Sequence, residues 1–317
     1  MPRKEYTHLV KPMLIQNGPA GLYPEPRIWM ESKDLEGFNA NFSFGFIKKP
    51  TVMHPLEGAV VHPYDECLVF EGTDSSNILH LGAEVSIRIG EEQEEHVFDK
   101  PTVVLIPKGT PHGPVNIRRV DRTIVHYHIG LAGEYRATKA PILASVEQGS
   151  KYGRFVKRMI TRVEPQQVRS DRSGMGYSSV IGQDGIMRPA DMGVGPGNGD
   201  QIVWLYGNDL EGFNVNFTWG FYSRNGKWHR GGEAHTHPEE EILCFVGLNP
   251  DDLSFLGVEL ELGMGKDYER HIFNKPTVAI CPKGFPHLPL ITRWCDKPYG
   301  FFVICLSGEH ASPWVEA

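Results

Sequence analysis

Residues 34–46 read DLEGFNANFSFGF and residues 209–221 read DLEGFNVNFTWGF. The second stretch begins 175 residues after the first (209 against 34), and the same spacing relates residues 100–103 to 275–278 and residues 133–134 to 308–309. A repeat of this length in a constant register indicates a tandem duplication. We therefore call a residue and the residue 175 positions later equivalent. At each position, the side chains of the two copies can then be compared.

Aromatic residues alternate with small or polar residues in both stretches. A period of two places alternate side chains on one face of a β-strand, and in the second copy this set is Phe213, Val215, Phe217, Trp219 and Phe221. Other β-rich runs at residues 67–70, 85–89, 102–106 and 123–129, and at the equivalent positions, are separated by Gly, Pro, Asn and Asp. Because no long helical periodicity interrupts them, we predict that each copy is an all-β sandwich or barrel.

The length of 317 residues allows two domains that each bury a core. We place the boundary within residues 142–150, which gives domains of residues 1–145 and 146–317. A shorter echo, YTHLVKPM at residues 6–13 against YGRFVKRM at residues 152–159, has a spacing of 146 (152 against 6). The second copy therefore carries about 29 extra residues, and we expect a long inserted loop at about residues 161–201.

The composition is that of a globular protein, with 40% hydrophobic residues, 22% charged residues and a formal net charge of −7. No run approaches the ~18 apolar residues of a membrane helix, no signal-peptide core follows the N-terminus, and the five irregularly spaced cysteines suggest reduced thiols. We expect a cytoplasmic protein with a small-molecule substrate and no membrane partner. The negative charge also disfavours nucleic acid, whereas exposed strand edges and the inserted loop favour a homo-oligomer.

Residues 235–241 of the second copy, HTHPEEE, carry the strongest chemical signal. His235 and His237 are two residues apart, hence on one face of a strand, and Glu241 follows four residues later. The turn PKGFPH at residues 282–287 then brings back a fourth candidate, His287. Three imidazoles and one carboxylate suit a divalent transition metal such as iron, manganese, nickel, copper or zinc, and they leave coordination positions open for water or substrate.

At these residues the chain resembles the cupin superfamily, whose first motif is His-x-His followed after three or four residues by Glu, and whose second is Pro-x-Gly-x-x-His. The resemblance covers nearly the whole chain as two cupin domains, a bicupin. It implies two tandem antiparallel β-barrels of the double-stranded β-helix or jelly-roll type, with His235, His237, Glu241 and His287 as metal ligands. His229 stands where the first motif often begins with Gly, and Ile291 replaces the Asn that often closes the second. We expect one divalent transition metal per chain, with Fe(II) favoured.

The first copy keeps only part of this ligand set, which comprises His62, Glu66 and His112. Val60 occupies the position equivalent to His235, so one ligand of the N-terminal cupin is missing. Two histidines and a carboxylate can still hold a metal as a facial triad, and His126 and His128 lie nearby in sequence where the second copy has Phe301 and Val303. Two interpretations stay open: the first copy holds a second metal site, or its site has decayed. We favour decay and expect the function to lie in the second copy.

His54 and His229 are equivalent histidines that both copies retain, each eight residues before the first-motif histidine that both keep. We expect them beside the site. There His229 could transfer protons or orient a substrate carboxylate. The alternative is a loop histidine that is hydrogen-bonded to the backbone.

These residues favour a metal-dependent bicupin enzyme that acts on a small organic acid or an oxygenated aromatic compound, by a dioxygenase-type oxidation. In this hypothesis Glu241 accepts a substrate proton and His229 assists as acid or base. One alternative is a redox-neutral isomerase, decarboxylase or hydrolase in which the metal stabilises an oxyanion. Another is a bicupin that binds a small molecule without catalysis. Fold and ligands do not select among these functions.

Overall fold

The computed structural model describes residues 4–141, 151–159, 179–181, 187–189, 199–227 and 234–310. In these residues almost all regular structure is β-strand, which confirms the prediction of an all-β protein. The helical segments among them are single 3₁₀ turns: η1 (Thr7–Leu9), η2 (Ser32–Asp34) and η3 (Gly153–Phe155). Within this part of the chain, none of the helices has the length and apolar character needed to cross a membrane.

The chain divides into two compact units. The N-terminal unit comprises Leu14–Asp74 and Ile78–Met159, and the C-terminal unit comprises Met1–Met13, Ser75–Asn77 and Ile160–Ala317. The domain boundary expected within residues 142–150 lies outside the described residues, as does most of the inserted loop expected at 161–201. Both remain predictions.

The N-terminal unit consists of two antiparallel sheets around a hydrophobic core that includes Leu68, Ile87 and Ile117. Its described residues form a seven-stranded sheet in the order β14 (Val156–Arg158), β10 (Thr102–Ile106), β7 (Glu66–Gly72), β12 (Ile124–Gly130), β4 (Asn41–Ile47), β3 (Arg27–Met30) and β2 (Ile15–Gln16). They also form a six-stranded sheet in the order β13 (Thr138–Ala140), β6 (Ala59–Val61), β11 (His112–Val120), β8 (Ala83–Ile89) and β9 (Glu94–Phe98), with β5 (Thr51–Met53) paired to β11.

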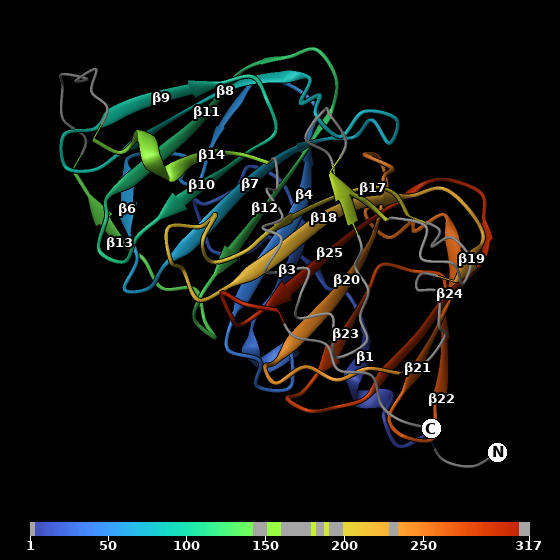
Figure 1. The fold of residues 1–317 in the computed structure, drawn as a ribbon. Helices are drawn as coiled ribbons and strands as arrows, with labels where there is room; N and C mark the ends of the chain where they lie inside the picture. Colours follow the sequence, from blue (N-terminus) through green and yellow to red (C-terminus); the bar gives the residue numbers. More distant parts are fainter. Residues whose placement is uncertain are drawn as a thin grey trace. The chain divides into compact units, whose positions relative to one another are not determined.

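The C-terminal unit repeats this plan. Its described residues form an eight-stranded sheet in the order β1 (Val10–Pro12), β23 (Thr277–Cys281), β20 (Glu241–Gly247), β25 (Tyr299–Cys305), β18 (Asn216–Tyr222), β17 (Gly199–Leu205), β16 (Met187–Pro189) and β15 (Ser179–Ile181). The second sheet has the order β19 (Gly226–Lys227), β24 (His287–Cys295), β21 (Val258–Met264) and β22 (Glu269–Phe273). Figure 1 shows β23, β20, β25 and β18 side by side in this unit and β10, β7, β12 and β4 side by side in the N-terminal unit.

Five pairs of equivalent strands keep the same bounds in the two copies. The pairs β4 and β18, β7 and β20, β10 and β23, β11 and β24, and β12 and β25 each start and end 175 positions apart. Phe42 and Phe44 are buried on one face of β4, as the alternation predicts, and Ser43 on the other face is buried as well. Its hydroxyl lies 2.7 Å from His128 Nδ1 on the neighbouring β12. The small and polar face of the repeat therefore forms part of a polar barrel interior.

Each unit takes its outermost strand from the segment that precedes the other copy in sequence. β1 pairs with β23 in the C-terminal unit, and β14 pairs with β10 in the N-terminal unit. The rings of Tyr6 and Tyr152 accompany these strands and lie over Gly265 and Gly90, which are themselves equivalent.

Gly90 shows how tightly the exchanged segment is packed. Its φ is +84°, and a methyl group at this position would overlap the ring of Tyr152. We expect Gly90→Ala to lower the free energy of unfolding by about 2–4 kcal/mol, because backbone strain and a displaced ring add together. The matched control is Gly37→Ala, where φ is +93° and nothing lies within 4 Å. It should cost only the backbone strain of about 1–2 kcal/mol. Equal shifts of the urea midpoint in both variants would contradict the packing of Tyr152 on Gly90.

Candidate metal centres

The four candidate ligands of the second copy come together at one end of the C-terminal barrel. Glu241 is the first residue of β20 and His287 the first residue of β24. His235 and His287 form an isolated antiparallel bridge, with backbone N–H groups donating to each other's carbonyl oxygen at 3.1 Å in both directions. This bridge fixes the positions of the first and second motifs relative to each other, although about fifty residues of chain separate them.

The side-chain atoms of this set converge. His235, His237, Glu241 and His287 each offer one ligand atom, and these atoms lie within 4.8 Å of one another. His237 Nε2 is 3.0 Å from His235 Nε2 and 2.9 Å from Glu241 Oε2, while His287 Nε2 is 3.4 Å from that oxygen. All four residues are buried. The structure therefore brings together the four residues that the sequence analysis named.

These distances fit a bound divalent cation. Ligand atoms about 2.1 Å from a metal and at right angles to one another are about 3.0 Å apart. His287 Nδ1–H donates to the carbonyl oxygen of Phe285 at 3.2 Å, which leaves the Nε2 lone pair for a metal. Burial would raise the pKa of Glu241, but the imidazoles of His237 and His287 outweigh it and hold that pKa well below its usual range. An ionised carboxylate beside imidazole lone pairs is the state in which such ligands bind a metal.

The N-terminal barrel contains an equivalent set with a different fourth member. Its ligand-type atoms, again within 4.8 Å of one another, belong to His54, His62, Glu66 and His112. Val60 does pair with His112, as His235 pairs with His287, so the equivalence holds for the backbone. The prediction that this set lacks one ligand is not confirmed, because His54 reaches the same cluster from the segment before β6. Its equivalent, His229, lies outside the described residues.

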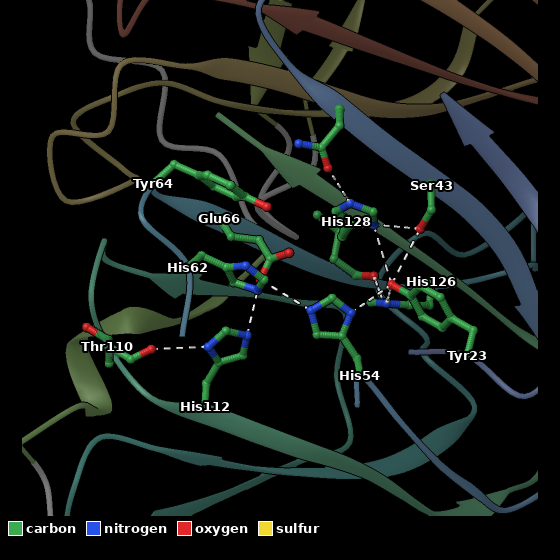
Figure 2. Close-up of polar contacts among 12 residues, drawn as sticks. Tyr23, Ser43, His54, His62, Tyr64, Glu66, Thr110, His112, His126 and His128 are labelled. Carbon is green, nitrogen blue, oxygen red and sulfur yellow. Dashed lines mark hydrogen bonds and ion pairs between the residues drawn. The ribbon is translucent and has the colours of Figure 1, made fainter. Parts of the chain in front are cut away.

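Figure 2 shows the three imidazoles of the N-terminal set turned toward the carboxylate of Glu66. The Nε2 atoms of His54 and His112 are each 3.2 Å from Glu66 Oε2, and that of His62 is 3.4 Å away. Among the described residues, Nε2 of His62 and of His112 has no partner with hydrogen-bond geometry. Atoms that approach closely without bonding to each other are expected where all of them point at a common ion.

Hydrogen bonds on the far side of each ring orient these imidazoles. His62 Nδ1–H donates to the carbonyl oxygen of Arg136 at 2.7 Å, and His112 Nδ1–H donates to that of Thr110 at 3.2 Å. A backbone carbonyl only accepts, so each Nε2 carries a lone pair directed at Glu66. Burial lowers the pKa of His62, which favours the neutral ring.

A relay of hydrogen bonds sets the tautomer of His54. His126 Nδ1–H donates to the carbonyl oxygen of Val69 at 2.9 Å, so its Nε2 accepts the hydroxyl hydrogen of Tyr23 at 3.2 Å. The Tyr23 oxygen is then an acceptor for His54 Nδ1–H at 2.9 Å. His54 Nε2 is left with a lone pair that faces a carboxylate at 3.2 Å, an arrangement that a cation stabilises.

His126 and His128, which the sequence left as further candidates, lie outside the four-residue cluster. His128 Nε2–H donates to Asn41 Oδ1 at 2.9 Å, and its Nδ1 accepts from Ser43 at 2.7 Å. Burial lowers the pKa of both imidazoles well below the usual value, so they stay neutral. Their role in this geometry is to orient Tyr23 and the β4 side chains. The sequence offered one signal for them, the apolar residues Phe301 and Val303 at the equivalent positions.

The structure adds two aromatic residues beside the ligand sets that the sequence did not indicate. The ring of His310 lies 4.7 Å from that of His237 and 4.6 Å from that of Trp204. In the N-terminal barrel the equivalent Tyr135 lies 5.0 Å from His62 and 5.6 Å from Trp29. In each set an aromatic ring at the equivalent position packs against one candidate ligand. That ring is the imidazole of His310 in the second copy and the phenol of Tyr135 in the first. The equivalence 135 to 310 was visible in the sequence, but nothing there placed either residue beside a ligand.

Comparisons with known proteins identify the fold. No model of a known protein family matches the sequence, and no curated protein sequence matches it. Solved structures of oxalate decarboxylase from Bacillus subtilis match it in three dimensions. The structure at pH 4.6 has a TM-score of 0.55 and 10% identity over 97% of this chain and 78% of that one. A deletion mutant of the same enzyme has a TM-score of 0.55 and 9% identity over 97% and 79%. These matches confirm the predicted fold of two tandem cupin-type barrels.

The ligand role of His54 can be tested by removing its imidazole and placing another at residue 60. We expect two divalent ions per chain after reconstitution, and one in His54→Ala, because three ligands bind more weakly than four. Adding Val60→His to that variant should restore the second ion, since residue 60 holds the backbone position of His235. Elemental analysis after desalting measures the ratio. Two ions retained in His54→Ala, or no recovery in the double variant while the far-ultraviolet spectrum is unchanged, would contradict this assignment.

Proposed function

We propose that the protein is a metal-dependent enzyme that acts on a small organic acid at the C-terminal centre by a redox-neutral reaction of the decarboxylase type. The observation that carries the proposal is the convergence of His235, His237, Glu241 and His287 within 4.8 Å. Three imidazoles and a carboxylate neutralise only one charge of a dication and leave coordination positions for an anionic substrate. A carboxylate is the natural occupant of such positions.

The type of reaction is supported by two further points. The solved structures that share this fold include oxalate decarboxylase, and one of them concerns the substrate binding mode and a reaction specificity switch in that enzyme. A decarboxylation needs charge stabilisation and one proton transfer, both of which the described site can provide. A dioxygenase reaction, the first hypothesis from the sequence, needs oxygen in addition, so the two differ in a measurable requirement.

Each residue of the C-terminal centre would have a separate role in the reaction. A divalent cation held there supplies Lewis acidity that stabilises negative charge on a substrate oxygen. Glu241 takes the acidic proton of the substrate. When the carbon–carbon bond breaks and carbon dioxide leaves, the electron pair stays on the remaining carbon, and the same proton returns to it. His310, against the ring of His237, donates a hydrogen bond that orients the substrate carboxylate.

The N-terminal centre suits a structural role. The side chains of His54, His62, Glu66 and His112 are 0% exposed. In addition, three rings of the N-terminal set are tied at Nδ1 to Tyr23, Arg136 and Thr110. We infer that a metal there holds the barrel together and that turnover belongs to the C-terminal centre.

Assays under nitrogen test the reaction type. We expect metal-loaded protein to release carbon dioxide from a small dicarboxylic acid, with oxalate as the first substrate, at the same rate with and without oxygen. His237→Ala should lower the rate at least 100-fold because it removes a ligand, while His62→Ala, its counterpart in the N-terminal barrel, should retain most of the activity.

If oxygen is consumed in proportion to turnover, the decarboxylase hypothesis is wrong and the dioxygenase hypothesis takes its place. Bound metal without turnover of any dicarboxylic, 2-oxo or aromatic acid would favour the non-catalytic binding protein. The favoured metal, Fe(II) from the sequence, is tested by reconstituting the same protein with iron, manganese, nickel, copper or zinc.

The role of His310 is tested by exchanging it for its equivalent. We expect His310→Tyr to lower kcat about tenfold or more with unchanged metal content, because a phenol fits this place in the N-terminal barrel but presents its donor differently. His8→Tyr, an exposed histidine of the same unit, is the matched control. An unchanged kcat in His310→Tyr would remove this residue from the proposal, and a parallel loss of metal would show that it only supports the ligands.

A further inference from the structure

Arg27 is a buried cation in the N-terminal barrel, away from the ligand cluster. It is the first residue of β3 and is 5% exposed. Its guanidinium lies 3.8 Å from the ring centroid of Tyr23, and one Nη–H donates to the carbonyl oxygen of His126 at 2.5 Å. Among the described residues, no carboxylate pairs with Arg27, and its buried Nε has no hydrogen-bond partner. A buried charge left in this state is costly unless something neutralises it.

A glycine on the adjacent strand leaves room for the side chain of Arg27. A Cβ atom at Gly45 on the adjacent β4 would lie 3.3 Å from the guanidinium carbon and 3.1 Å from Arg27 Cβ. The absence of a side chain at Gly45 therefore makes room for the arginine. The equivalent residues in the C-terminal barrel are Ile202 and Gly220, so an apolar side chain fills the same position there. Packing alone does not require a charge at this position.

A cavity of about 490 Å³ opens beside Arg27. It is lined by Tyr23, Pro24, Glu25, Pro26, Arg27, Gly45, Phe46, Ile47, Lys48, Lys49, Thr51 and Met53. Three of these side chains are cationic and one is acidic, and the two lysines and Glu25 are exposed. The remaining lining is largely apolar. This volume is in the range of pockets for small organic ligands, in which a few polar groups orient an otherwise apolar molecule.

We propose that this cavity is a binding site for a small amphipathic carboxylate, whose anionic group pairs with Arg27 and whose apolar part packs on Phe46, Ile47 and Met53. A planar guanidinium matches the two oxygens of a carboxylate. Lys48 and Lys49 at the exposed rim attract the anion electrostatically before it enters. The apolar lining favours an aryl or alkyl carboxylate over inorganic phosphate, which has no apolar surface to bury.

This site is separate from the metal centre but shares one residue with it. Tyr23 lines the cavity, while its hydroxyl accepts from His54 Nδ1. In Figure 2, His54 lies between Glu66 and Tyr23. The proposed ligand is thus one side chain away from a metal ligand, and the proposal holds whether or not the C-terminal centre catalyses a decarboxylation.

Calorimetric titration of the metal-loaded protein tests the site, with benzoate and octanoate as probes and phosphate as the comparison. We expect saturable binding of at least one carboxylate and none of phosphate. Arg27→Ile, which installs the residue of the equivalent position, should weaken binding at least tenfold. Lys49→Glu, at the exposed rim, should weaken it several-fold, and Lys100→Glu, an exposed lysine of the same unit, should leave it unchanged.

The two variants separate this cavity from the metal centres. Carboxylate binding that keeps full affinity in both Arg27→Ile and Lys49→Glu would place the anion on a metal and overturn the proposal. Binding of phosphate alone would overturn it as well. So would the absence of any heat of binding with both carboxylates at millimolar concentration. If Arg27→Ile fails to fold, the ratio of affinities between Lys49→Glu and Lys100→Glu decides the question.

Discussion

A carboxylate enclosed by imidazoles inside each barrel is the constraint on which the rest of the structure depends. Glu66 and Glu241 are fully buried among three histidines each, and an ion in that environment is stable only when it is neutralised. The strands and the segments between them place the four side chains, and backbone carbonyls orient the rings of His62, His112 and His287. A divalent cation would supply the missing charge. Small and polar residues at alternate positions of β4 then follow from the polar interior.

Much of the architecture could be predicted from the sequence because the duplication acts as its own alignment. The alternating residues of β4 and β18 indicated strands whose bounds prove to be 175 positions apart. In the C-terminal set, Glu241 and His287 are the first residues of β20 and β24, so their spacing follows the strand pattern. His235 and His237 do not share a strand as the sequence predicted, because His235 forms only an isolated bridge and His237 lies in the irregular segment before β20. His54 could not be assigned in this way, since it reaches the cluster from an irregular segment whose path depends on the whole barrel. Tyr135 and His310 were missed for the same reason.

The two copies place different residues around their equivalent clusters of ligand-type side chains. Val60 stands at the position equivalent to His235, and among the described residues His54 is the fourth member of the N-terminal cluster. His126 replaces a phenylalanine and Arg27 replaces an isoleucine, which gives the N-terminal barrel a more polar interior than its counterpart. Loss of a motif residue is therefore a poor measure of loss of a site. The chemistry at a point in space can persist while the position that supplies it changes.

The exchanged edge strands bear on the history of the chain. β1 completes the sheet of the C-terminal unit and β14 completes that of the N-terminal unit, so the arm that precedes each copy serves the other copy. A single ancestral copy with such an arm would have been complete only as a swapped dimer. Gene fusion would have turned a concentration-dependent association into an intramolecular one, after which each half was free to diverge without losing its partner.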